Sequence, residues 1–120
     1  MIVNSSFVVL DGDRKTRDLV SAFLTYKGYD ATVLDENVDF FDSLVKDAMR
    51  IMVADLGTLF ARTNDALSRI WQGDPELVLI VYGPSDTART LPHDERLIFL
   101  PKPLNLDELE SVVMRALEYQ

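Results

Sequence analysis

Two aspartates and a lysine stand at the ends of three short apolar runs in this sequence. They are Asp11, Asp55 and Lys102, and the runs that precede them cover 7–10, 51–54 and 97–100. If the runs are parallel strands of one sheet, the three groups emerge at the same carboxyl edge, which is where open α/β sheets place their sites. Two carboxylates and an ammonium would then converge on one point and form a site of opposed charges.

The elements that must position these groups follow from the apolar pattern, which alternates between short continuous runs and helical spacing. Such alternation is typical of βα units around a buried parallel sheet. Right-handed crossovers between the units predict a doubly wound, three-layer α/β fold of the flavodoxin-like strand order 2-1-3-4-5. The predicted strands cover 7–10, 29–34, 51–54, 77–81 and 97–100.

Helices are predicted between the strands and after the last one. Asp13 and Asn105 are typical helix N-cap residues, and Gly28 is a typical helix stop. Residues 56–59 are expected to form a loop that leads into the third helix. The predicted helices cover 14–27, 37–49, a segment with its core side at 66–71, and a last helix with a buried stripe over 106–117.

The segment over 83–96 should hold the fourth helix but contains two prolines. Because proline cannot sit inside a helix, Pro92 leaves at most two turns after Pro84. We therefore expect a short or irregular fourth helix.

Composition limits the protein class. The chain has 120 residues and 48% hydrophobic content, which predicts a single domain over 1–120. Whether it is complete or the N-terminal domain of a longer regulator stays open. It has no cysteine, so a disulfide, a thiolate metal site and a cysteine nucleophile are excluded.

The sequence has no secretory leader or apolar run of membrane-spanning length, so we expect a cytoplasmic protein without membrane contact.

The formal net charge of −8 argues against direct binding of nucleic acid by this domain. Binding of phosphate backbones requires clustered Lys and Arg side chains. If the protein regulates DNA, we expect another domain to contact it.

Four motifs in order give the chain a family resemblance. They are Phe-Val-Val-Leu-Asp at 7–11, Gly-Tyr-Asp-Ala at 28–31, Val-Ala-Asp-Leu at 53–56 and Phe-Leu-Pro-Lys-Pro at 99–103. With these motifs the whole chain resembles the receiver domain of bacterial two-component response regulators. The resemblance implies a signal-transduction role in a phosphorelay rather than an enzyme.

The resemblance also implies roles for single residues. Asp55 would be the phosphoacceptor, and Lys102 would contact first this aspartate and then the phosphoryl group. Mg²⁺ would be held by Asp11, Asp55 and the backbone carbonyl of Gly57, because this cation prefers oxygen ligands. The peptide bond between Lys102 and Pro103 would be cis.

One departure from the family concerns the cation. The family has an acidic pair after the first strand, and its second member is here Gly12. The loss of one carboxylate predicts weak or absent Mg²⁺ binding. The neighbouring Asp13 is expected to be engaged as a helix cap.

The other departure concerns the switch. Where the family has Ser or Thr at the end of the fourth strand, this chain has Tyr82. The family couples that hydroxyl to an aromatic residue on the fifth strand, here Phe99. We expect the phenol oxygen to lie farther out and the ring to fill the space into which Phe99 would move, which would block the switch.

Three hypotheses remain open. In the favoured one, the chain is an atypical receiver that acts through protein–protein contacts, with weak or absent phosphorylation at Asp55. In the second it is a conventional receiver phosphorylated on Asp55 with Mg²⁺, and in the third a flavodoxin-like domain that binds a small molecule.

For the receiver hypotheses we expect protein partners. These are a sensor histidine kinase or another signalling protein, and an output domain or partner protein, most often in transcription regulation. A homodimer through the face of the fourth helix, fifth strand and fifth helix is also predicted.

Overall fold

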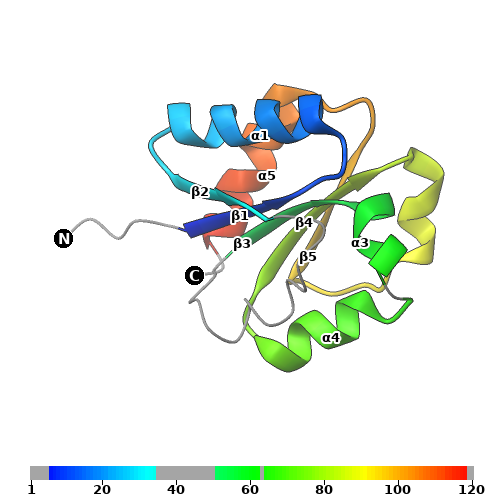
Figure 1. Cartoon of the computed structure of the whole chain (residues 1–120). Coiled ribbons are helices and arrows are strands. Elements are labelled where there is room, and N and C mark those ends of the chain that lie inside the picture. Colours follow the sequence, from blue (N-terminus) through cyan, green and yellow to red (C-terminus); the bar gives the residue numbers. More distant parts are fainter. Residues whose placement is uncertain (1–5, 35–50, 63, 119–120) are drawn as a thin grey trace.

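Five parallel strands form one sheet in the order β2-β1-β3-β4-β5, as the sequence predicts (Figure 1). The computed structural model describes residues 6–34, 51–62 and 64–118. The strands are β1 (Ser6–Leu10), β2 (Asp30–Val33), β3 (Ile51–Asp55), β4 (Val78–Gly83) and β5 (Leu97–Pro101). The two central neighbours, β3 and β4, are buried along their whole length, as expected for strands covered on both faces.

Helices cover both faces of the sheet, because successive strand residues point to opposite sides. On one face, α1 (Arg14–Tyr26) and α5 (Leu106–Glu118) pack over alternate strand residues such as Val9, Val53 and Ile80. On the other face, α3 (Leu56–Arg62) and α4 (Ala66–Gly73) pack over the intervening residues, such as Met52 and Leu79. The result is the predicted three-layer fold.

The predicted helix ends are confirmed at α1 and α5. The Asp13 carboxylate accepts a hydrogen bond from the Thr16 amide at 3.1 Å and so caps α1. Beyond α1, Gly28 takes a φ of 91°, a left-handed conformation that glycine adopts at little cost. Asn105 accepts hydrogen bonds from the amides of Asp107 and Glu108 at 2.8 and 3.1 Å at the start of α5.

One predicted loop is a helix. Residues 56–59 belong to α3, which begins directly after β3 without a connecting loop. The Asp55 carboxylate accepts a hydrogen bond from the Thr58 amide at 2.9 Å, the contact that an N-cap residue makes three positions into a helix. Because Asp55 itself starts the helix, the loop expected around Gly57 does not form. The helix predicted over 37–49 lies outside the described residues.

The segment between β4 and β5 is irregular, as predicted. It holds only a 3₁₀ helix, η1 (Ser85–Thr90), drawn in yellow in Figure 1. The hydroxyl groups of Thr87 and Thr90 donate to the backbone carbonyls of Pro84 and Thr87 at 2.5 and 2.6 Å. Pro92 lies just beyond η1 and is incompatible with a longer helix.

Candidate functional site

The carboxyl edge of the sheet brings the predicted site residues together. Asp11 follows β1, Asp55 ends β3, and Tyr82 in β4 is the register partner of Asp55. Lys102 follows β5, and its Nζ lies 2.6 Å from Asp55 Oδ1. Its peptide bond to Pro103 is cis, as the resemblance implies.

Asp55 is a nearly buried carboxylate with a partner at each oxygen. Its Oδ2 accepts hydrogen bonds from the amide and the hydroxyl of Thr58, at 2.9 and 2.8 Å. Its Oδ1 is buried and has no well-directed hydrogen bond within the described part of the chain, so the Lys102 ammonium is its close ionic partner there. Burial by itself would raise the pKa of Asp55, but the contacts with Lys102 and Thr58 outweigh it and hold the pKa below its ordinary value.

Asp11 is also buried, with 3% of its surface exposed. Its Oδ1 accepts a hydrogen bond from the Asp13 amide at 2.8 Å, and its Oδ2 accepts a hydrogen bond from the Tyr82 hydroxyl. The Tyr82 side chain is fully buried. Burial and the adjacent Asp11 carboxylate raise the pKa of Tyr82 far above its ordinary value, so the phenol stays protonated and remains a donor.

Thr58 is a site residue that the sequence reasoning missed. Besides donating to Asp55, its hydroxyl oxygen accepts the Gly12 amide at 3.0 Å and so links the end of β1 to the end of β3. The available signal was a hydroxyl residue three positions after a strand-ending aspartate, the spacing of a helix cap.

The residues at this edge do not fit a Mg²⁺ site. Both oxygens of Asp11 and Oδ2 of Asp55 already accept hydrogen bonds, and Asp55 Oδ1 faces an ammonium. Gly12 offers no side chain, and the Asp13 carboxylate caps α1 as predicted. Gly57 lies in the first turn of α3. Among the described residues, no group of three or more His, Asp or Glu side chains could hold a metal ion.

The two predicted switch residues, Tyr82 and Phe99, lie on opposite faces of the sheet. The Tyr82 ring packs in the core beneath α1 and α5, whereas Phe99 packs against the core on the other face of the sheet. Neighbouring strand positions explain the difference, because Phe99 pairs with Val81 and the next residue, Tyr82, points the opposite way. The Tyr82 ring therefore does not lie beside Phe99 in this structure, and a block of the inward movement of Phe99 stays a prediction.

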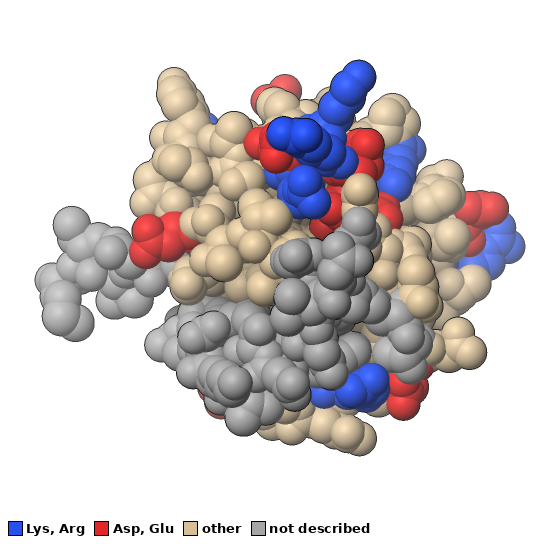
Figure 2. Space-filling view, viewed as in Figure 1, with Lys and Arg blue, Asp and Glu red and all other residues tan. Residues whose placement is uncertain are grey.

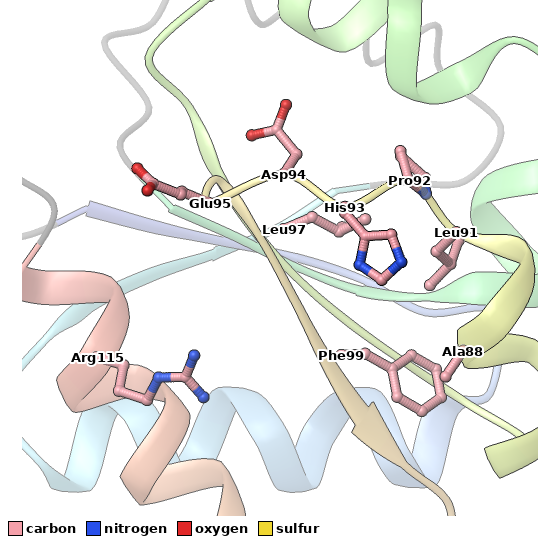
Figure 3. A pocket seen from close by; sticks show the side chains of 9 residues that line it. All are labelled: Ala88, Leu91, Pro92, His93, Asp94, Glu95, Leu97, Phe99 and Arg115. Atoms are coloured by element: carbon pink, nitrogen blue, oxygen red, sulfur yellow. The ribbon is translucent and has the colours of Figure 1, made fainter.

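Phe99 lies instead at a hollow of about 490 Å³ beside η1. Figure 3 shows the Phe99 ring next to Ala88, with Leu91 and His93 nearby and Arg115 reaching in from α5. This hollow is on the side of the molecule formed by η1, β5 and α5, away from the edge that holds Asp11 and Asp55.

Charged side chains of both signs lie side by side at the top of the view in Figure 2, rather than as a broad basic surface. No helix in the described ranges is long and apolar enough to span a membrane.

Solved structures with similar folds include several receiver domains. A response regulator receiver domain protein from Clostridium thermocellum superposes with a TM-score of 0.81 at 14% identity, over 95% of this chain and 94% of that one. A two-component transcriptional regulator AraC from Clostridium phytofermentans gives 0.76 at 14% identity, over 97% and 94% of the two chains. A CheY-like protein, TadZ, from Pseudomonas aeruginosa gives 0.69 at 16% identity, over 94% and 99%.

These likenesses establish the receiver-type fold. The sequence matches no protein-family model and no curated protein sequence.

Proposed function

We propose that this chain is an atypical receiver domain that signals through protein–protein contacts, with weak or absent phosphorylation at Asp55. The observation that carries the proposal is the state of its two strand-end carboxylates. Every oxygen of Asp11 and Asp55 is already contacted by a donor or a cation from the chain itself.

Phosphorylation of a carboxylate requires compensation of charge. The attacking Asp55 oxygen and the incoming phosphoryl group are both negative, and a divalent cation normally offsets this repulsion. Here Lys102 supplies a single positive charge, and the neighbouring groups do not fit a cation. Transfer at Asp55 is therefore expected to be slow or absent.

The proposed partners are proteins. A sensor histidine kinase or another signalling protein would act on the domain, and an output domain or partner protein would respond to it. The similar regulator from Clostridium phytofermentans is described as a transcriptional regulator, which supports an output of that kind. We place partner docking or homodimerisation on the side formed by η1, β5 and α5, where the hollow beside Phe99 lies.

A conventional receiver is the second candidate, and one contact favours it. Lys102 Nζ lies 2.6 Å from Asp55 Oδ1, and the lowered pKa of Asp55 keeps the carboxylate in its nucleophilic, ionised form. On this alternative, Mg²⁺ would enter the site after rearrangement of the groups that now contact Asp11.

Intact-protein mass after incubation with acetyl phosphate and Mg²⁺ separates the two candidates. We expect no phosphoryl adduct on the native chain. The double variant Gly12→Asp, Tyr82→Thr returns the family's acidic pair and small hydroxyl, and we expect it to acquire the adduct. An adduct on the native chain that disappears in Asp55→Asn would establish the conventional receiver instead.

The contact function has its own measurement. Light scattering during size-exclusion chromatography reports assembly, and we expect Asp55→Asn to leave it unchanged. Phe99→Ser, on the proposed docking side, should reduce it. Loss of assembly in Asp55→Asn alone would contradict the proposal.

A further inference from the structure

The hydrogen bond between Tyr82 and Asp11 crosses an intervening strand. The order β1-β3-β4 places β3 between the strand that Asp11 follows and the strand that carries Tyr82. Two strand spacings amount to roughly 10 Å, a span that a short hydroxyl side chain on β4 would not bridge. The length of tyrosine is therefore what brings a donor to Asp11.

This donor occupies the oxygen that a cation would need. Asp11 Oδ1 accepts the backbone amide of Asp13, a contact that holds the turn before α1. Oδ2 is held by the side chain of Tyr82. Mg²⁺ requires near-octahedral oxygen ligands at about 2.0–2.1 Å, so it must compete with the phenol proton for the lone pairs of this oxygen.

The two carboxylates are thus compensated separately. Asp55 faces the Lys102 ammonium, and Asp11 faces the Tyr82 hydroxyl. The two compensating side chains also lie close to each other. Lys102 Nζ is 5.8 Å from the centre of the Tyr82 ring. Together, the Lys102 ammonium and the Tyr82 hydroxyl compensate the charges of Asp55 and Asp11, which a cation would otherwise do.

We propose that the Tyr82 hydroxyl occupies the position beside Asp11 Oδ2 that a divalent cation would need, and that it thereby excludes divalent cations from this site. The inference rests on the proposed function and explains why the site acts without a metal. Removal of this one oxygen leaves Asp11 Oδ2 buried without a donor. A buried carboxylate oxygen in that position gains from a cation, because an uncompensated charge is costly to bury.

The test uses Mg²⁺ alone, without a phosphodonor, on the native chain and on Tyr82→Phe. Amide NMR shifts at Asp11 and Asp55 and the melting temperature are followed during the titration. We expect the native chain to be unmoved at millimolar Mg²⁺. We expect Tyr82→Phe to bind at least tenfold more tightly, with its melting temperature rising as Mg²⁺ is added.

Tyr26→Phe is the matched control. It removes the same oxygen from a tyrosine that is 86% exposed on α1. It should behave as the native chain does. Equal Mg²⁺ binding by the native chain and Tyr82→Phe would overturn the proposal, and so would the absence of binding in both.

A second measurement uses only the native chain, so it does not depend on whether a variant folds. A buried, hydrogen-bonded phenol proton exchanges slowly with water, so the Tyr82 hydroxyl should give a resolved proton NMR signal. We expect this signal to persist in the native chain at millimolar Mg²⁺, and its loss on adding Mg²⁺ would overturn the proposal.

The test of the Tyr82 proposal and the test of the proposed function can fail independently of each other. A phosphoryl adduct on the native chain would refute the atypical receiver. The inference about Tyr82 is judged only by cation binding without a phosphodonor.

Discussion

At the carboxyl edge of the sheet, Asp55 pairs with Lys102 from another strand, whereas at the amino edge Asp94 pairs with Arg96 two positions away in the same loop. The Arg96 guanidinium donates two hydrogen bonds to the Asp94 carboxylate, at 2.9 and 2.7 Å, and one to the Pro75 carbonyl at 2.6 Å. The Arg96 backbone amide also donates to this carboxylate, at 2.9 Å. Its guanidinium also lies 4.2 Å from the centre of the Trp71 ring.

The two edges differ in what their charges do. The amino-edge pair is a local clamp at the surface, which fastens the end of α4 to the start of β5 and is satisfied by its own neighbours. The carboxyl-edge carboxylates are held partly by near neighbours in the chain, Asp13 and Thr58, and partly by groups from other strands, including a fully buried phenol. Because Asp11 and Asp55 are buried and depend on partners from other strands, a single substitution of such a partner can leave a buried carboxylate oxygen without a donor or an ionic partner.

The largest expected effect comes from truncating the aromatic residue at each edge. Tyr82→Ala removes a fully buried ring and the donor to Asp11, and should lower the free energy of unfolding by about 3–5 kcal/mol. Trp71→Ala removes a partly buried ring whose Nε1 donates to the Leu77 carbonyl at 3.0 Å, and should cost about 2–3 kcal/mol. Urea unfolding measures both, and a larger cost for Trp71→Ala would reverse the comparison.

An intermediate effect is expected from Lys102→Met. The substitution leaves Asp55 Oδ1 without its ionic partner, but the Lys102 side chain is 44% exposed and water can replace part of the contact. We expect a loss of about 1–2 kcal/mol in urea unfolding. The same substitution in an Asp55→Asn background should cost less, because no charge then needs a partner. Equal costs in both backgrounds would show that the ion pair contributes no stability.

The smallest effect concerns pH and salt. The pKa of Asp94 is lowered to about 2 by Arg96, and that of Asp55 is lowered by Lys102 and Thr58 against the opposing effect of burial. Because both folded-state values lie below the unfolded value of about 3.9, each carboxylate contributes stability above that pH. The contribution is lost as the pH falls through the folded-state pKa.

Melting temperatures from pH 2 to 6 in Asp94→Asn and Asp55→Asn isolate the two contributions. High salt should reduce the Asp94 contribution more than that of Asp55, because the Asp94 side chain is 26% exposed and the Asp55 side chain only 12% exposed. If salt removed both equally, the two edges would not differ in shielding.

Local sequence patterns were sufficient for most of the fold. Sequence patterns placed all five strands to within about two residues. Continuous apolar runs marked β1, β3 and β4 because these strands are buried along most or all of their length, whereas β2 is an outer strand with mostly exposed residues. Asp13 and Asn105 marked helix starts, since capping depends on residues within one turn. The prolines at 84 and 92 predicted the short η1 for an equally local reason. The start of α3 was missed because Asp55 was interpreted only as a site residue and not also as a cap.

The sequence by itself determined that Asp11, Asp55 and Lys102 would meet at one edge, that Gly12 lacks a carboxylate, and that a tyrosine stands at position 82. Only the tertiary structure decided which group the phenol contacts. That contact joins residues 71 positions apart across an intervening strand, so it depends on strand order, register and side-chain direction together. For the same reason, only the structure showed that Tyr82 and Phe99 lie on opposite faces of the sheet.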